Sequence, residues 1–173
     1  WDENYLKAIA DSISQNAGSK IFIGALYDYN SRKIIKDKSE KFGNRANFTT
    51  KVLKVNPGIT GSNTVVEKSV FLTSKGYDPY LTTGQDKALI LDLVIKGYKV
   101  NRVVSAVMFH RLDTVGSRQT EYAKRLKGKI RFILKYQNIM KAQILIFNIA
   151  YLMKIISQSM IVKLKINFVL HGK

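Results

Sequence analysis

The chain contains no cysteine, and this absence excludes disulfide bonds and thiolate metal sites. A chain without cysteine suits a reducing compartment. Three catalytic patterns are absent as well: a Ser-His-Asp order, the glycine-rich phosphate loop that ends in Gly-Lys-Ser/Thr, and His-Glu-x-x-His. The sequence therefore argues against a serine protease, a P-loop enzyme and a zincin.

Acidic residues are scarce, with 12 Asp and Glu against 29 Lys and Arg, so the net charge is +17. The excess is uneven, because residues 118–173 carry +11 and the residues before them carry +6. Charge at this density attracts polyanions, either nucleic acid or anionic lipid headgroups. The alternative is a solvated basic surface that has no polyanionic partner.

Long apolar runs are also lacking. The longest covers residues 144–153 and is bracketed by Lys141 and Lys154. A bilayer span needs about 20 apolar residues, so this run is too short to cross a membrane alone. With 173 residues, 46% of them hydrophobic, the chain is nevertheless long enough to bury the core of one domain.

Hydrophobic periodicity predicts mixed α and β structure before about residue 117 and only helices after it. The first part has predicted helices at 4–15, 68–74 and 86–96, and predicted strands at 20–27, 33–36, 63–66 and 98–109. The last part has predicted helices at 119–136, 139–158 and 160–170. We expect the strands at 20–27 and 98–109 to be buried.

The first predicted helix has apolar residues at helical spacing, namely Leu6, Ile9, Ala10 and Ile13. This spacing is typical of a helix, and we expect the helix to end at residues 16–18. Residues 48–55 fit neither a helix nor a strand clearly.

The most informative motif lies between residues 76 and 100. A Gly-Tyr-Asp turn at 76–78 leads through a short loop to Gly-Gln-Asp at 84–86, which opens a helix. A Gly-Tyr-Lys step at 97–99 then enters a β-branched run. This order resembles the acceptor-side segment of family 2 glycosyltransferases, which are inverting enzymes with a GT-A fold. The family usually has Gly-Glu-Asp at the helix start, so the chain departs from it at Gln85.

The resemblance continues on both sides of this motif. Residues 56–71 resemble the family's Gly/Ser loop, strand and helix, and residues 107–111 resemble a strand that ends in His-Arg. Residues 1–6 resemble the segment that follows the metal-binding Asp-x-Asp. The match covers roughly residues 1–118, and it implies that the family's first strands, its nucleotide-binding acid and its Asp-x-Asp lie upstream of Trp1.

For the fold, the resemblance implies an α/β protein with a partial GT-A mixed sheet and flanking helices. Residues 1–117 would form the acceptor-side part of the catalytic domain, and residues 118–173 would form a helical, basic, membrane-associating tail. Because the donor site would lie upstream, we expect this fragment alone not to turn over.

The resemblance gives Asp86 the role of catalytic base. Inverting transfer needs one carboxylate to remove the proton of the acceptor hydroxyl. The first turn of a helix favours an ionised acid, since its free backbone N–H groups lie there. The alternative is a helix-start acid with no further role. Gln85 cannot ionise, but its amide can orient the acceptor by hydrogen bonding.

Other residues are assigned substrate or metal roles by the same resemblance. Gly61, Ser62 and Asn63 resemble the loop that lines the sugar pocket, with an ordinary tight turn as the alternative. Arg111 can reach the diphosphate, since a guanidinium suits phosphate geometry. His110 resembles a third metal ligand of related enzymes, with a structural histidine as the alternative. Trp1 either stacks on a sugar or packs.

The predicted function is inverting transfer of a sugar from a nucleotide-diphospho-sugar donor to a glycan or glycolipid acceptor, in polysaccharide or glycolipid synthesis. A divalent metal, Mg or Mn, would be bound mostly upstream. One alternative is an inactive truncated remnant of a transferase. Another is a basic nucleic-acid-binding module, but we do not expect nucleic acid as a partner, because few aromatics are interleaved with Arg.

The basic tail is expected to hold the enzyme to an anionic membrane surface, in the cytoplasm and peripheral on the inner face of the plasma membrane. Its Lys and Arg would face headgroups while Ile144, Phe147 and Tyr151 enter the acyl boundary. The alternative is that these helices pack on the catalytic domain or pair with another subunit.

Overall fold

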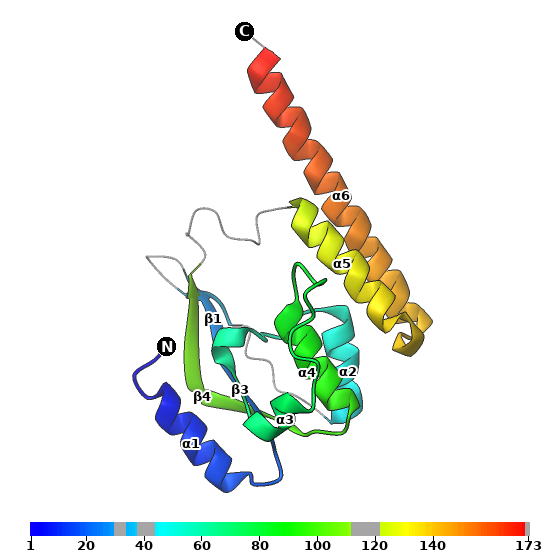
Figure 1. The fold of residues 1–173 in the computed structure, drawn as a ribbon. Helices are drawn as coiled ribbons and strands as arrows, with labels where there is room; N and C mark the ends of the chain where they lie inside the picture. Colours follow the sequence, from blue (N-terminus) through cyan, green and yellow to red (C-terminus); the bar gives the residue numbers. More distant parts are fainter. Residues whose placement is uncertain (30–33, 38–43, 112–121, 172–173) are drawn as a thin grey trace. The chain divides into compact units, whose positions relative to one another are not determined.

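The computed structural model describes residues 1–29, 34–37, 44–111 and 122–171 (Figure 1). The chain forms two compact units, one of Trp1–Asp78 with Gln85–Val115 and one of Pro79–Gly84 with Gly116–Lys173. The predicted boundary at residues 117 and 118 lies outside the described residues. The roles assigned to the two parts remain predictions.

A mixed four-stranded sheet forms the centre of the first unit. Strand β1 (Ile21–Tyr29) pairs in parallel with β4 (Val100–Arg111) along its whole length. The other edge of β1 is shared by β3 (Thr64–Val66) and β2 (Ile34–Asp37), both antiparallel to it. The four strands thus occupy three positions across the sheet. This confirms the α/β class and the predicted partner strand near residues 33–36.

Helices cover both faces of the sheet (Figure 1). Helix α1 (Tyr5–Gln15) lies on one side, and α2 (Arg45–Lys54) and α4 (Gln85–Ile95) lie on the other. A short helix, α3 (Lys68–Leu72), follows β3. Residues 48–55, which were ambiguous in sequence, therefore belong mainly to α2. Gly76 and Gly97, which follow α3 and α4, have positive φ angles, as is usual for glycines after a helix end.

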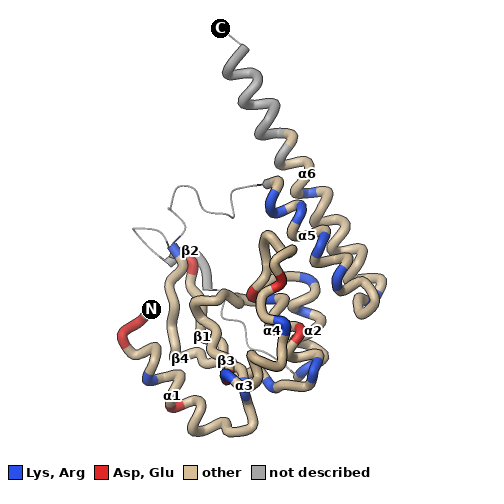
Figure 2. The backbone as a smooth tube through the Cα atoms, in the orientation of Figure 1, with Lys and Arg blue, Asp and Glu red and all other residues tan. Residues whose placement is uncertain are grey.

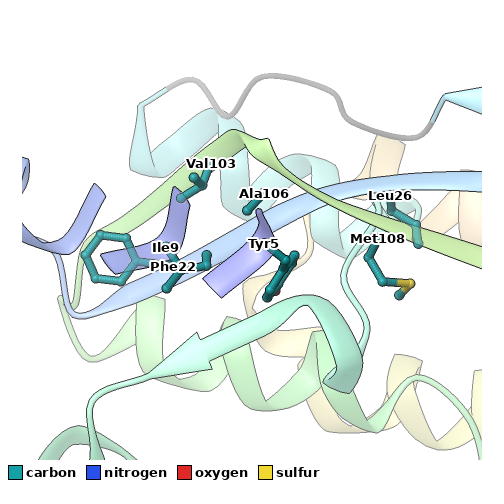
Figure 3. Packing of buried hydrophobic residues seen from close by; sticks show 7 residues of the cluster. All are labelled: Tyr5, Ile9, Phe22, Leu26, Val103, Ala106 and Met108. Carbon is teal, nitrogen blue, oxygen red and sulfur yellow. The ribbon is translucent and has the colours of Figure 1, made fainter. Parts of the chain in front are cut away.

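Of the four apolar residues at helical spacing in α1, only Ile9 is buried against the sheet. Tyr5, Ile9 and Ser12 are its buried residues, whereas Leu6 is 78% exposed and Ile13 is 44% exposed. Figure 3 shows Tyr5 and Ile9 in one apolar cluster, whose other members are Phe22, Leu26, Val103, Ala106 and Met108.

The physical reason lies at Gly24, which has no side chain to keep the ring of Tyr5 away. A Cβ there would lie 2.8 Å from the ring of Tyr5 and 2.5 Å from the carbonyl oxygen of Ala106. The close approach of Tyr5 to the centre of β1 fixes the rotation of α1.

The two main strands differ in burial. Ile21 to Leu26 of β1 are buried, as predicted, but the buried residues of β4 are only Val103, Ala106 and Met108. Val104 and Phe109 of β4 are exposed, so the predicted burial of the strand at 98–109 holds only in part. Val104 lies where the register between β1 and β4 shifts, and such an irregularity turns side chains out of the regular pattern.

The second unit is built on two helices. They are α5 (Tyr122–Tyr136) and α6 (Ala142–His171), joined through the 3-10 turn Gln137–Ile139. The predicted break between residues 158 and 160 is wrong, because α6 is continuous. The hydroxyl of Ser157 donates to the carbonyl of Lys154 inside this helix. No helix in the described part of the chain is long and apolar enough to cross a membrane.

The loop before β3 is tied to the sheet by one buried amide. Asn63 is fully buried and donates to the carbonyl oxygens of Gly24 at 2.8 Å and Gly58 at 2.9 Å. Its own oxygen accepts from the backbone N–H of Thr60 at 2.9 Å. Arg102 donates to the same two carbonyls and to that of Pro57. The loop is therefore fixed to the middle of β1.

Replacing Asn63 by Ala should lower the free energy of unfolding by about 3 kcal/mol, since a buried group left without its partner costs about 1–3 kcal/mol. Urea unfolding followed by circular dichroism measures the change. The matched control is Asn47→Ala on the exposed side of α2, which should leave stability nearly unchanged. Equal effects of the two substitutions would contradict the role given to Asn63.

Candidate active site

Asp86 lies on the first turn of α4 and faces the fixed loop. Its carboxylate accepts hydrogen bonds from the backbone N–H of Gly61, from the hydroxyl of Tyr77 and from its own backbone N–H. A Cβ at Gly61 would lie only 3.0 Å from Asp86 Oδ1 and 3.5 Å from the Tyr77 hydroxyl. Glycine at this position thus lets the loop backbone approach the acid closely.

The pKa of Asp86 lies above its ordinary value. Burial of the carboxyl group raises the pKa, and the hydrogen bonds from Gly61 and Tyr77 lower it by a smaller amount. The pKa of the Tyr77 hydroxyl is also raised, first by burial and then by the neighbouring charge of Asp86. Tyr77 therefore keeps its proton and acts as a donor to the acid.

The surface around Asp86 carries exposed groups. Gly61 and Ser62 are exposed, and so is the ring of Tyr77. The indole of Trp1 is 74% exposed and donates to the carbonyl oxygen of Ser62 at 2.6 Å. The indole is thus held beside the loop that contacts Asp86, with most of its surface open.

Two of the predicted substrate residues, Asn63 and Gln85, form hydrogen bonds with backbone groups around the site. Asn63 lies beneath the loop, where its amide is used as described above. Gln85 donates its side-chain amide to the carbonyl oxygen of Asp78 at 3.3 Å, which links the helix start to the Gly-Tyr-Asp turn. Their positions are those of residues that hold the loop and the turn in place.

His110 and Arg111 lie at the carboxyl end of β4, next to the carboxyl end of β1. Asp28 of β1 is the register partner of His110, and its Oδ1 lies 2.9 Å from Nδ1 of His110. Asp28 is buried, while the side chain of His110 keeps 31% of its surface exposed. Arg111 is exposed. Ligands of α/β proteins commonly bind at this end of parallel strands.

The pairing with Asp28 bears on the predicted metal site. A carboxylate on one imidazole nitrogen orients the ring so that the other nitrogen can bind a metal. His110 therefore fits as one ligand, through Nε2. The described residues contain no group of three potential ligands, so a complete site would need donors in addition to His110.

Two residues of the site were missed in the sequence analysis. Tyr77 was noted only as part of a turn, although an aromatic hydroxyl nine residues before the acid was visible. The predicted strand ends at residue 27, just before Asp28, whereas β1 continues through Tyr29. The pairing of Asp28 with His110 depends on the β1–β4 register, which no local pattern reveals.

Two hollows of the first unit lie away from Asp86. One of about 570 Å³ is formed between α1 and β4, with Lys7, Asp11 and Ser105 in its lining. Another of about 450 Å³ lies at the start of α2, beside Arg45 and Tyr98. Neither hollow has Asp86 in its lining.

Replacing Tyr77 by Phe should raise the pKa of Asp86 further, since it removes a donor that favours the ionised carboxylate. A pH titration of the Asp86 side-chain carbon resonance by NMR measures the shift. Tyr98→Phe is the matched control, because its hydroxyl contacts Thr73 instead. A pKa of Asp86 that stays unchanged or falls in Tyr77→Phe would contradict the hydrogen bond.

Comparison of the chain with protein-family models, with curated proteins and with solved structures gave no match. A function for this arrangement is therefore argued from the chain's own residues and from the order of its motifs.

Proposed function

We propose that this chain supplies the acceptor side of an inverting glycosyl transfer, with Asp86 as the general base. The observation that carries the proposal is the position of Asp86. A half-buried carboxylate on a helix start is held by the N–H of Gly61 and the hydroxyl of Tyr77, next to an exposed loop. The same residues belong to the motifs that resemble family 2 glycosyltransferases, and the partial GT-A fold is part of this proposal.

In the proposed reaction an acceptor hydroxyl donates a hydrogen bond to Asp86. As the acceptor oxygen attacks the anomeric carbon of the donor, its proton passes to the carboxylate, and the bond from that carbon to the nucleoside diphosphate breaks. A raised pKa makes Asp86 a stronger base than an ordinary aspartate. The donors from Gly61 and Tyr77 hold the carboxylate in one orientation, which lowers the entropic cost of the step.

The exposed groups beside the acid suit an acceptor sugar. The indole of Trp1 presents an apolar face, and Ser62 and Tyr77 add polar atoms near it. A binding surface of this kind combines an aromatic ring for packing with a few polar groups for orientation. Of the two roles predicted for Trp1, we propose stacking on a sugar instead of packing in the protein, because Trp1 is 74% exposed.

The carboxyl ends of β1 and β4 are the proposed diphosphate side. Arg111 would contact the phosphate oxygens, and His110, oriented by Asp28, would be one ligand of a divalent ion such as Mg²⁺ or Mn²⁺. Such an ion would neutralise the departing diphosphate. We propose that the remaining ligands and the nucleotide site come from residues outside this chain.

The proposed acceptor is a glycan or glycolipid, and an anionic membrane surface remains the proposed location. The structure corrects one detail of the predicted attachment. Ile144 is 3% exposed and packs inside the second unit, so it is not available for the acyl boundary. The hydroxyl of Tyr151 accepts a hydrogen bond from Arg125 at 3.2 Å. Phe147 is 41% exposed, and it remains a residue proposed to enter the acyl boundary.

In an active protein that contains this chain, Asp86→Asn should lower the transfer rate about 10²–10⁴-fold, the usual contribution of a general base. The amide keeps the shape of the carboxylate but cannot accept the proton, so donor binding should persist. The measurement is release of nucleoside diphosphate in the presence of donor and acceptor, together with donor affinity.

Asp92→Asn is the matched control on the same helix, and it should leave the rate nearly unchanged. A loss of less than about tenfold in Asp86→Asn would rule Asp86 out as the base. A large loss in both variants would indicate damage to α4 instead of lost chemistry.

A further inference from the structure

Helix α6 has two mainly apolar sides, which lie on roughly opposite faces of the helix. One side is buried in the helix pair and includes Ile144, Asn148 and Ile155. Asn148 accepts a hydrogen bond from Lys129 of α5, so this side faces α5. Phe132 and Tyr136 of α5 are buried as well.

The other side of α6 is an exposed apolar stripe. Its members are Ile146, Ile149, Met153, Ile156 and Met160, which are 38–65% exposed. They follow one another at intervals of three, four, three and four residues. This is the spacing of the contact positions in paired helices. At 3.6 residues per turn the stripe lies opposite the side that packs on α5.

The charge of the helix pair lies elsewhere. Helix α5 carries six Lys and Arg, whereas the sequence from 142 to 160 contains a single charged residue, Lys154. Figure 2 shows this contrast, with blue segments concentrated along α5. Lys129 points into the pair, where burial lowers its pKa to about 8. Lys124 and Lys127 are exposed, and Lys127 lies on the side of α5 that faces away from α6.

The arrangement separates apolar surface from basic surface. A helix that lies on an anionic membrane presents its basic residues beside its apolar face, so that both reach the interface together. In this unit six basic residues belong to α5, whereas the stripe lies on the side of α6 that faces away from α5. Positions that border the stripe, among them Ala150, Leu152 and Ser157, are uncharged. A partner at the stripe therefore meets no charge.

We propose that a second copy of this chain packs on the stripe through its own α6, as a symmetric dimer. An identical stripe is complementary in spacing and in its lack of charge, and a twofold axis through it closes the assembly. The two copies of α5 would be three helix spacings apart, about 24–30 Å at 8–10 Å each. Because the Debye length is about 8 Å at physiological salt, their positive charges would be well screened. This inference is independent of glycosyl transfer.

The test is sedimentation velocity of the 173-residue chain over a range of concentrations. The unaltered chain should show a monomer–dimer equilibrium, and Met153→Asp should raise the dimer dissociation constant by at least about tenfold, as expected at the centre of an interface. Leu134→Asp on α5 is the matched control for Met153→Asp, because the two residues are similarly exposed, Leu134 at 58% and Met153 at 62%. It should change the constant by no more than about twofold.

The lack of cysteine allows a second measurement that does not depend on a charged substitution. Met153 is the middle residue of the stripe, so it meets its own copy whether the helices pair in parallel or antiparallel. Met153→Cys should form a disulfide-linked dimer on mild oxidation, whereas Leu134→Cys should not.

A chain that stays monomeric, or equal effects at both positions, would overturn the proposal. So would a monomeric chain that binds vesicles of anionic lipid in a way that requires Met153, because this result would assign the stripe to lipid. Circular dichroism of each variant distinguishes a lost interface from a lost fold.

Discussion

The buried amide of Asn63 is the interaction from which the proposed site is built. It joins the loop before β3 to the middle of β1, and Arg102 reinforces the same carbonyl groups. Because the loop is fixed there, the N–H of Gly61 is aimed at Asp86 and the carbonyl of Ser62 is in place for Trp1. A movable loop would supply neither group at a defined position.

Two opposing effects determine the pKa of the Asp86 carboxyl group. Burial disfavours its charge, and the donors from Gly61 and Tyr77 favour it, with burial the larger effect. A general base benefits from this balance, because an acid of ordinary pKa holds a proton too weakly to drive its transfer. The hydrogen bonds from Gly61 and Tyr77 therefore oppose the effect of burial on the pKa and favour the ionised form of the acid.

Patterns that depend on neighbours along the chain were predictable from the sequence. The buried run of β1, the helix that opens at Gln85 and the glycines after α3 and α4 were of this kind. Rotation of α1 was not, because the face that packs depends on the absence of a side chain at Gly24, on a different element. The exposure of Val104 depends on the shift in register between β4 and β1.

The candidate site likewise has features that were predictable from the sequence and features that were not. The placement of Asp86 on a helix start and of Gly61 in a tight loop followed from glycine and acid spacing. The contact between them, and the part played by Tyr77, arise from three segments that meet only in the folded chain. The pair of Asp28 and His110 likewise requires the parallel register of β1 and β4. Long-range register and packing are not encoded in any short window.

The central claim is that Asp86 receives the proton of an acceptor hydroxyl. The most direct measurement is a crystal structure of an active protein containing this chain, with a nucleoside diphosphate and an acceptor sugar bound together. The account predicts an acceptor hydroxyl about 2.6–3.2 Å from the Asp86 carboxylate, the distance that proton transfer requires, with Gly61 and Tyr77 still bonded to the acid. An acceptor bound elsewhere, with no hydroxyl in reach of Asp86, would contradict it.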